Sequence, residues 1–338
     1  MLYFYIIYST LIIIITVYFK KNKLLSNYTG DTHQLFSNKD NIPLLGGIFL
    51  IVPILLMNYE TLIYQLLVLL IFLVGFLSDR KILISPQKRF VFQIFLVFIS
   101  VVFLNLEILS SKLIFFDNLL KIKIFNIIFS SFCLLILING SNFIDGLNSL
   151  LLIYMTLVII ILYKLNLISG FSLNDDSVKY LILFLMFLIV LNLLNLLMLG
   201  DAGAYILSFF VGYLIISSHK INANISPYFY IAIIWYPCYE ILFSIIRKIR
   251  SKFSPLKPDN KHLHQLLYIF ISKKIFSNKL SANNVSSLLI NIINFIIIYI
   301  SSLKPYSSIY QIKLITLSLI IYTIVFLYLK MKIKNYER

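Results

Sequence analysis

The sequence predicts an all-α protein that crosses a membrane many times. Hydrophobic residues make up 60% of the 338 residues, and the mean hydropathy is +0.95. Apolar runs of about 17–22 residues recur along the chain, each long enough to cross roughly 30 Å of hydrocarbon as a helix. No connection between them is long enough for a water-soluble domain. Residues 1–338 are therefore predicted to form a single integral membrane domain.

The apolar runs predict eleven transmembrane helices, with boundaries uncertain by a few residues. They lie near residues 3–19, 44–59, 61–77, 90–106, 122–138, 147–163, 179–199, 203–218, 227–246, 284–303 and 312–329. The first run has no basic segment before it and no small-residue cleavage site after it, so we interpret it as a retained helix rather than a signal peptide. Cys133 and Cys238 lie inside predicted spans and are expected to pack there without a disulfide.

The basic residues predict the orientation. Threading eleven helices places 21 of the 29 Lys and Arg residues on one side, all of them in 20–42, 78–89, 247–283 and the tail from 330, and eight on the other. The positive-inside rule assigns the richer side to the cytoplasm, with the N-terminus outside and the C-terminus inside. Topology then explains most of the net charge of +16, and no nucleic-acid partner is needed.

Three acidic residues have an unusual position for so apolar a chain. Asp79, Asp145 and Asp201 each lie at the end of a long apolar run, and the threading puts all three on the cytoplasmic side. A charge beside hydrocarbon is costly, so acids at the edge of a bilayer are candidates for function. We expect the three carboxylates to build one site for a metal ion and phosphate groups.

The segment NGSNFIDGLN carries Asn139, Asn142, Asp145 and Asn148 at three-residue intervals. On a helical turn this spacing places the side chains on one face, where carboxamides and a carboxylate suit a polar ligand. The alternative is a helix cap, with Gly146 allowing close packing.

The segment LMLGDAGAY sets glycines on both sides of Asp201, so that the backbone can approach a ligand while the carboxylate faces a cation. Asn192 precedes it on the same predicted helix and is expected to bind substrate. PLLGG at 43–47 supplies a tight turn beside the same face.

The segment GFLSDRKILISPQKR offers Ser78 and Lys88 as candidate catalytic residues. The alternative is a basic cluster that sets the topology and is anchored by one acid.

The largest inner loop, RKIRSKFSPLKPDNKHLHQLLY, gathers basic residues around His262 and His264. Cations and imidazoles together could neutralise a diphosphate through charge-assisted hydrogen bonds. The alternatives are contact with anionic lipid and, for the two histidines, a metal site. A His-x-His pair with one acid nearby is sparse for zinc.

In order and spacing, five of these motifs, from about His33 to Leu267, resemble the polyprenyl-phosphate N-acetylhexosamine-1-phosphate transferases, the family of MraY and WecA. The resemblance implies a cytoplasmic cleft of a bacterial inner membrane that holds Mg²⁺ and a UDP-N-acetylhexosamine. A phosphate oxygen of undecaprenyl phosphate would attack the sugar-bearing phosphorus and release UMP. The resemblance also implies a homodimer.

The resemblance assigns roles by position. Asp201 matches the principal magnesium ligand, Asp79 the second acid of an Asp-Asp pair and further metal ligand, and Lys88 the basic position after that pair. Glu240 stands where many members have Asp. The remaining matches are expected to bind the nucleotide, the metal or the diphosphate: Asn139, Asn142, Asp145, Arg247, His262 and His264.

Three positions depart from the family pattern. Ser78 replaces the first Asp, often proposed to deprotonate the lipid phosphate, Asn148 replaces an acid, and Gln265 replaces the last histidine. A phosphate monoester has a second pKa near 6 and is largely a dianion at neutral pH. We therefore expect Mg²⁺ and orientation, rather than a dedicated base, to supply most of the catalysis.

Two other functions remain open at this stage. A transporter or lipid flippase predicts broken helices and polar residues at the bilayer midplane, whereas most predicted spans are uninterrupted Ile, Leu and Phe. A non-catalytic relative is suggested by Ser78 and Gln265. The sugar is not identified by the sequence, but the motifs favour the priming of a surface glycan over a peptidoglycan precursor.

Overall fold

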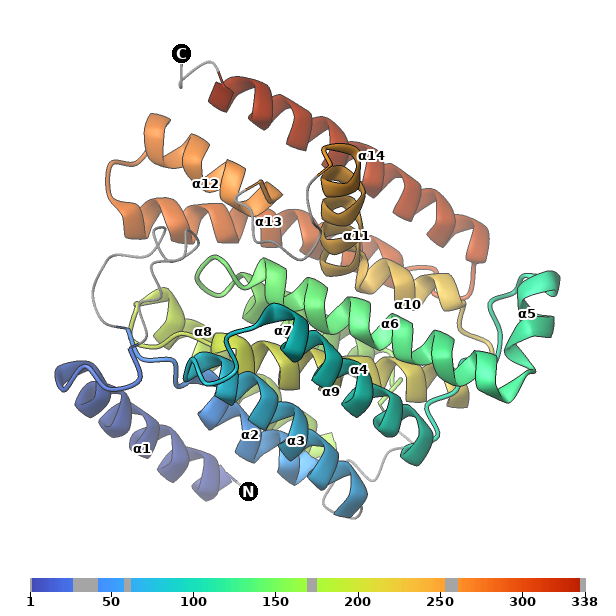
Figure 1. Ribbon diagram of the computed structural model, residues 1–338, viewed down its shortest axis with the longest axis horizontal. Coiled ribbons are helices and arrows are strands. Elements are labelled where there is room, and N and C mark those ends of the chain that lie inside the picture. Colours follow the sequence, from blue (N-terminus) through green and yellow to red (C-terminus); the bar gives the residue numbers. More distant parts are fainter. Residues whose placement is uncertain (1, 27–41, 58–61, 169–174, 253–260, 335–338) are drawn as a thin grey trace.

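The computed structural model describes residues 2–26, 42–57, 62–168, 175–252 and 261–334 (Figure 1). Within these ranges the chain is helical and forms no β-strand. The helices are α1 (Leu2–Lys21), α2 (Gly46–Met57), α3 (Leu62–Asp79), α4 (Pro86–Phe103), α5 (Ile114–Leu120), α6 (Lys123–Ile144), α7 (Leu150–Lys164), α8 (Asp175–Leu193), α9 (Gly200–Ile221), α10 (Pro227–Ile233), α11 (Trp235–Arg250), α12 (Leu263–Lys274), α13 (Lys279–Ser302) and α14 (Ser308–Lys334).

The structure confirms an all-α polytopic fold. All eleven predicted segments fall on helices, and α5 and α12 are additional short ones. By length and composition, eight of the described helices can cross a membrane, or nine if α10 and α11 form one span. The remaining two predicted spans, α2 and α7, are apolar helices of 12 and 15 residues.

The ninth predicted span is broken, contrary to the expectation of an uninterrupted helix. The axes of α10 and α11 meet at 77°. Pro237 explains the break, because its nitrogen has no hydrogen to donate to the carbonyl of Ile233 and its ring crowds that carbonyl. The Ile233 carbonyl instead accepts a hydrogen bond from the Tyr154 hydroxyl at 2.9 Å.

Contacts between helix ends agree with the predicted threading. Lys20, at the end of α1, donates to the backbone oxygen of Asn195, just past the end of α8. On the opposite side, Lys220 near the end of α9 donates to the backbone oxygen of Asn105, just past the end of α4. These ends are paired as the alternation of eleven passes requires. Which side faces the cytoplasm stays a prediction.

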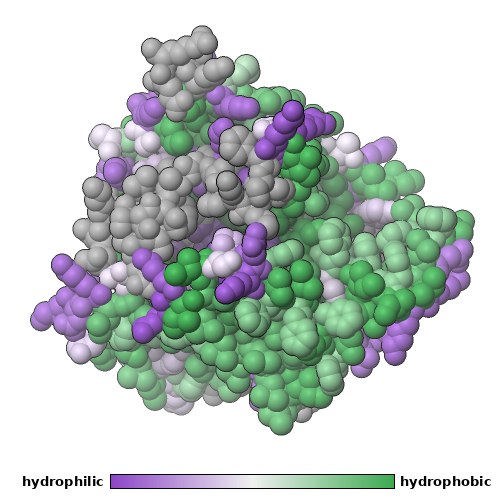
Figure 2. All heavy atoms as spheres, in the orientation of Figure 1, coloured by the Kyte–Doolittle hydropathy of each residue, from purple (hydrophilic) through white to green (hydrophobic). Residues whose placement is uncertain are grey.

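Apolar side chains cover much of the surface. Figure 2 shows a broad hydrophobic face over the helices, with hydrophilic residues mostly toward its margins. The apolar window of α1 is only 17% buried inside the protein, whereas that of α9 is 78% buried. Lipid is the environment that such a surface fits. Helix α9 is thus the centre of the bundle.

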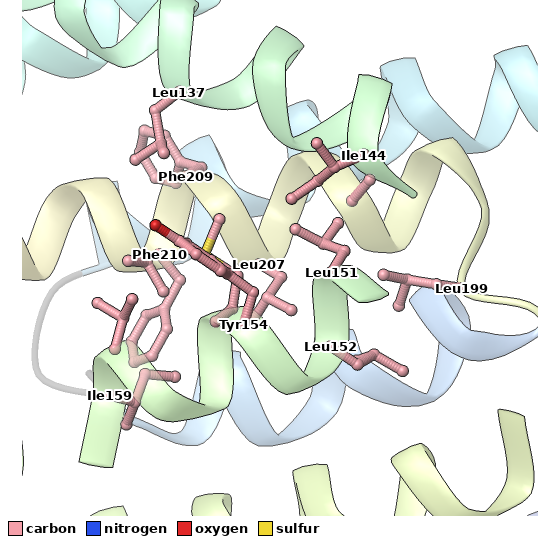
Figure 3. Close-up of a cluster of buried hydrophobic side chains, with 14 of the residues drawn as sticks. Leu137, Ile144, Leu151, Leu152, Tyr154, Ile159, Leu199, Leu207, Phe209 and Phe210 are labelled. Atoms are coloured by element: carbon pink, nitrogen blue, oxygen red, sulfur yellow. The ribbon is translucent and has the colours of Figure 1, made fainter. Parts of the chain in front are cut away.

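The core gathers around α9, which packs against α2, α3, α6 and α7. Figure 3 shows Leu137 of α6, Leu151 and Tyr154 of α7, and Phe209 and Phe210 of α9 in one buried cluster. Close packing of this kind makes the core sensitive to changes in side-chain volume.

The first turn of α9 is held tightly between α2 and α3. A Cβ added to Gly47 of α2 would lie 2.4 Å from the nitrogen of Gly203, and one added to Gly75 of α3 would lie 2.4 Å from the Cα of Ala202. Just before α9, Leu44 and Met198 form a short parallel bridge. The segments PLLGG and LMLGDAG are therefore direct neighbours, and they set the position of residue 201.

We predict that Gly75→Ala destabilises the protein by about 1–3 kcal/mol, because the new methyl group meets backbone that cannot move aside. Gly212→Ala is the matched control. Its Cβ would lie 2.4 Å from the Cδ2 of Leu134, the far end of a flexible side chain, so its effect should be smaller. Thermal unfolding in detergent measures both. Equal effects would contradict the proposed rigidity of this contact.

Candidate functional site

The site begins at the junction of α3 and α9. The carboxylate of Asp79, the last residue of α3, accepts hydrogen bonds from the backbone nitrogens of Asp201 at 2.8 Å and Ala202 at 3.0 Å. Asp79 therefore caps the first turn of α9 from outside that helix, where the helix dipole also favours a negative charge. Gly200 has a φ of 74°, and a Cβ there would lie 2.7 Å from an oxygen of Asp79. This position requires glycine.

Asp201 itself is bound by two side chains. Its Oδ2 accepts a hydrogen bond from the Ser78 hydroxyl at 2.6 Å and an ion-paired hydrogen bond from the Arg89 guanidinium at 2.7 Å. Arg89 also donates to the Ser78 oxygen at 2.6 Å. The side chains of Arg89 and Asp201 are 25% and 24% exposed, so solvent reaches this edge of the site. Ser78 orients Asp201 while its own oxygen is occupied by Arg89.

The basic side chain that contacts Asp201 is that of Arg89, and the role expected of Lys88, one residue before it, stays a prediction. Helix α4 begins at Pro86 after the N-cap Ser85, and successive residues of a helix point about 100° apart. Only one of the two side chains can face α3 and α9. Lys88 is exposed, whereas Arg89 is half-buried.

Asp145 completes a group of three carboxylates. It follows the last residue of α6 and, within the residues that the structure describes, its side chain has no hydrogen bond or ion pair. Burial, and then the neighbouring charges of Asp201 and Asp79, raise the pKa of the Asp145 carboxyl well above its ordinary range. The three acids are therefore within electrostatic reach of one another, and Asp79 and Asp201 meet directly through the hydrogen bond from the Asp201 backbone nitrogen.

The histidine loop meets this group at Gly146. A Cβ added to Gly146 would lie 2.6 Å from the Nε2 of His264, so glycine lets the ring pack beside Asp145. The ring of His262 lies 5.7 Å from that of His264, nearly parallel to it, and 5.2 Å from that of Phe143. The segments NGSNFIDGLN and HLHQ thus pack directly against each other.

Other basic and polar residues of the loop have defined contacts. Lys248 is buried, with its ammonium 6.0 Å from the ring centre of Phe143. Arg247 donates to the hydroxyl of Ser244 and lies over the ring of Phe326 in α14. Gln265, which departs from the family pattern, accepts a hydrogen bond from the backbone nitrogen of residue 262 and so caps α12.

The four regularly spaced residues do not all share one face. Asn139, Asn142 and Asp145 lie along the last turns of α6, and Asn139 donates to the Leu135 carbonyl of its own helix. The helix ends at Ile144, so the three-residue spacing no longer places Asn148 on the same helical face.

Asn148 and Asn192, which we expected to bind substrate, are instead part of a buried polar cluster. The Asn148 amide donates to the side-chain oxygens of Asn195 at 2.7 Å and Asn284 at 3.0 Å. Asn192 accepts from the backbone nitrogen and the hydroxyl of Ser149 and donates to the Leu197 carbonyl. These bonds join the start of α7 to the end of α8 and the start of α13. Buried amides bonded in this way stabilise a fold.

The sequence arguments missed Arg89 as a contact of Asp201, and Phe143 and Gly146 as contacts of the histidines. The Ser-Pro signal identifies the start of α4 but not which side of the helix faces Asp201. His33, where the resemblance begins, lies outside the described residues.

Residues 61–219 match the model of the family described as "Glycosyl transferase family 4". The chain is also 29% identical over 169 residues to a phospho-N-acetylmuramoyl-pentapeptide-transferase of Prochlorococcus marinus, an alignment that covers 43% of this chain and 47% of the relative. The chain thus spans about half the length of that curated relative. Both matches confirm the resemblance to the MraY and WecA family.

The family 4 segment contains the three carboxylates and Arg89, but it ends before the histidine loop. Within the described residues, no group of three or more His, Cys, Asp or Glu side chains is arranged to hold a metal ion by itself. Mg²⁺ does not need such a group, because it usually takes one or two carboxylates together with water and phosphate oxygens. Asp201 and the unpartnered Asp145 fit this requirement.

We predict that Asp145→Asn raises the melting temperature in EDTA by about 2–4 °C. The pKa of Asp145 is higher in the folded protein than in the unfolded chain, so its stabilising proton is lost, and stability falls, as the pH rises above the ordinary carboxyl range. A neutral amide removes this cost. Added Mg²⁺ should stabilise the wild type more than the variant. Thermal unfolding with and without Mg²⁺ checks both effects.

Asp117→Asn is the matched control for this prediction. Asp117 lies in α5 at the other side of the bundle and accepts hydrogen bonds from Ser110 and Ser111. Its neutralisation should lower the melting temperature and leave the response to Mg²⁺ unchanged. A lower melting temperature for Asp145→Asn in EDTA would argue against a strained carboxylate.

Proposed function

We propose that this protein transfers a sugar-1-phosphate from a UDP-linked N-acetylated sugar to undecaprenyl phosphate, and releases UMP. The observation that carries the proposal is the gathering of three carboxylates, a guanidinium and two imidazoles at one end of a membrane-type helix bundle. Most of this group belongs to the segment that matches glycosyl transferase family 4.

The position of the site suits these two substrates. One is a soluble nucleotide sugar, and the other is a lipid whose phosphate lies at the membrane surface. They can meet only where helix ends reach water, and the three acids lie at such ends. The excess of Lys and Arg on this side supports a cytoplasmic site in a bacterial inner membrane. A homodimer remains an expectation from the family resemblance.

Asp201 and Asp145 would hold the divalent cation, which we propose to be Mg²⁺. Asp79, expected as the second ligand, stays a candidate: its oxygens accept backbone hydrogen bonds from α9 and so order the turn that carries Asp201, and a carboxylate has further lone pairs for a cation. When bound, the cation would stabilise charge on the diphosphate and on departing UMP.

The other residues of the site would stabilise negative charge rather than transfer protons. In the proposed reaction an oxygen of the lipid phosphate forms a bond to the sugar-bearing phosphorus. The bond from that phosphorus to the UMP oxygen breaks, and the electron pair leaves with UMP. The Ser78 hydroxyl is bonded to Asp201 and Arg89, which does not suit a general base. Arg89 carries the positive charge that would face the phosphates.

The acceptor and the sugar are the finer part of the proposal. The name of the Prochlorococcus relative states that it transfers phospho-N-acetylmuramoyl-pentapeptide. We propose a smaller N-acetylated sugar for this chain, in the priming of a surface glycan. A panel of UDP-sugars that includes UDP-N-acetylmuramoyl-pentapeptide distinguishes the two.

The direct test is UMP release by purified protein with undecaprenyl phosphate, Mg²⁺ and the UDP-sugar panel. We expect release with at least one donor, and a loss of at least about 100-fold in kcat for Asp201→Asn, since this carboxylate would hold the charge-stabilising cation. Near-normal turnover of Asp201→Asn would rule out metal-centred catalysis. No UMP from any donor would favour a transporter or a non-catalytic relative.

A second prediction distinguishes the contributions of two neighbouring basic residues of α4, Arg89 and Lys88. Arg89→Gln should lower kcat/KM for UMP release by about 10–100-fold, because a charged hydrogen bond contributes about 1.5–3 kcal/mol. Lys88→Gln, one residue away on the exposed side of α4, should change it by less than about threefold, as an exposed charge contributes little. The reverse order of effects would restore the role that the resemblance assigns to Lys88.

A further inference from the structure

A buried carboxylate lies behind the histidine loop. Glu240 of α11 is only 1% exposed, and it has three donors around it. Its Oε1 lies 2.9 Å from the Nδ1 of His262 and 3.4 Å from the backbone nitrogen of Leu263, and its Oε2 accepts a hydrogen bond from the Tyr322 hydroxyl at 2.7 Å. A buried charge persists when it is paired and fully bonded in this way.

This arrangement determines how the His262 ring is held. One ring nitrogen is bonded to the carboxylate, and the ring packs between Phe143 and His264. His262 is also the N-cap of α12, where Gln265 bonds its backbone nitrogen. Both the backbone and the ring of His262 are therefore fixed before any ligand arrives.

The third partner comes from a distant part of the chain. Tyr322 belongs to α14, outside the family 4 match at 61–219 and beyond the motifs of the resemblance. Its ring is fully buried and packs on Tyr239 and Phe243 of α11, with ring centres 4.9 and 5.4 Å away. Helix α14 is thus tied to the loop that borders Asp145.

We propose that Glu240 and Tyr322 are positioning residues that hold the imidazole of His262 at the candidate site with a proton on Nδ1. Nδ1 faces a carboxylate, which accepts hydrogen bonds and donates none, so this nitrogen is the donor. An imidazole fixed in this way suits the diphosphate of a nucleotide sugar, and this part of the inference rests on the proposed function.

The first measurement is ¹⁵N NMR of protein labelled at histidine, in detergent at neutral pH. The chain has four histidines, and His262→Gln assigns the signal of residue 262. We expect a protonated Nδ1 in the wild type. Glu240→Leu removes the acceptor and should move the proton toward Nε2. Glu240→Gln should retain it on Nδ1, because its amide oxygen can accept from Nδ1 and from the nitrogen of Leu263.

The second measurement is calorimetric binding of UDP in the presence of Mg²⁺. Glu240→Leu should weaken binding about tenfold or more, because partners of a ligand-binding histidine typically contribute about 10–100-fold. Tyr322→Phe should weaken it by less, since it removes one of three donors to the carboxylate. Tyr328→Phe, on the same helix but 48% exposed, should have no effect.

Failure of this inference is distinct from failure of the proposed function. If folded Glu240→Leu keeps the wild-type His262 signal and UDP affinity, the positioning role is overturned, whether or not the protein releases UMP. If the His262 signal depends on Glu240 as expected while no UDP-sugar yields UMP, the positioning role stands and the proposed reaction fails. Tyr322→Phe provides the same comparison if Glu240→Leu does not fold.

Discussion

The capping of α9 by the carboxylate of Asp79 is the interaction on which the site depends. It joins the end of α3 to the start of α9, and it requires glycine at residue 200, where a side chain would collide with the carboxylate. Close packing of Gly47 and Gly75 holds the same turn from α2 and α3. Because Asp201 lies in this turn, the backbone itself determines where its carboxylate stands.

The membrane explains why the chemistry lies at helix ends. Within hydrocarbon every polar group needs a partner inside the protein, and the described spans are mostly apolar. The buried amides of Asn148 and Asn192 meet this requirement by bonding to other side chains and to the backbone, and they stabilise the bundle. Charges that must meet ligands are left at the edge, where water and substrates are available.

The site has an inner layer and a support behind it. Asp201 and Arg89 stand at the solvent-accessible edge, with the more buried Asp145 near them, while Glu240 and Tyr322 lie behind His262. The broken span contributes directly to this support. Since α11 leaves α10 at 77°, it brings Glu240 under the histidine loop and Lys248 beside Phe143.

The sequence by itself determined the helices, their alternation and the convergence of residues 79, 145 and 201. The length of an apolar run and the distribution of basic residues are properties of whole segments, so they predict helices and topology without knowledge of any contact. Tertiary structure alone decided which side chains meet. It brought Arg89, rather than the neighbouring Lys88, into contact with Asp201, because successive residues of α4 point about 100° apart. It also placed Asn148 off the predicted face, because α6 ends at Ile144. It also placed the Asp79 carboxylate where it accepts a hydrogen bond from the backbone of α9. These choices depend on helix rotation and termination, which differ by single residues and are set by packing.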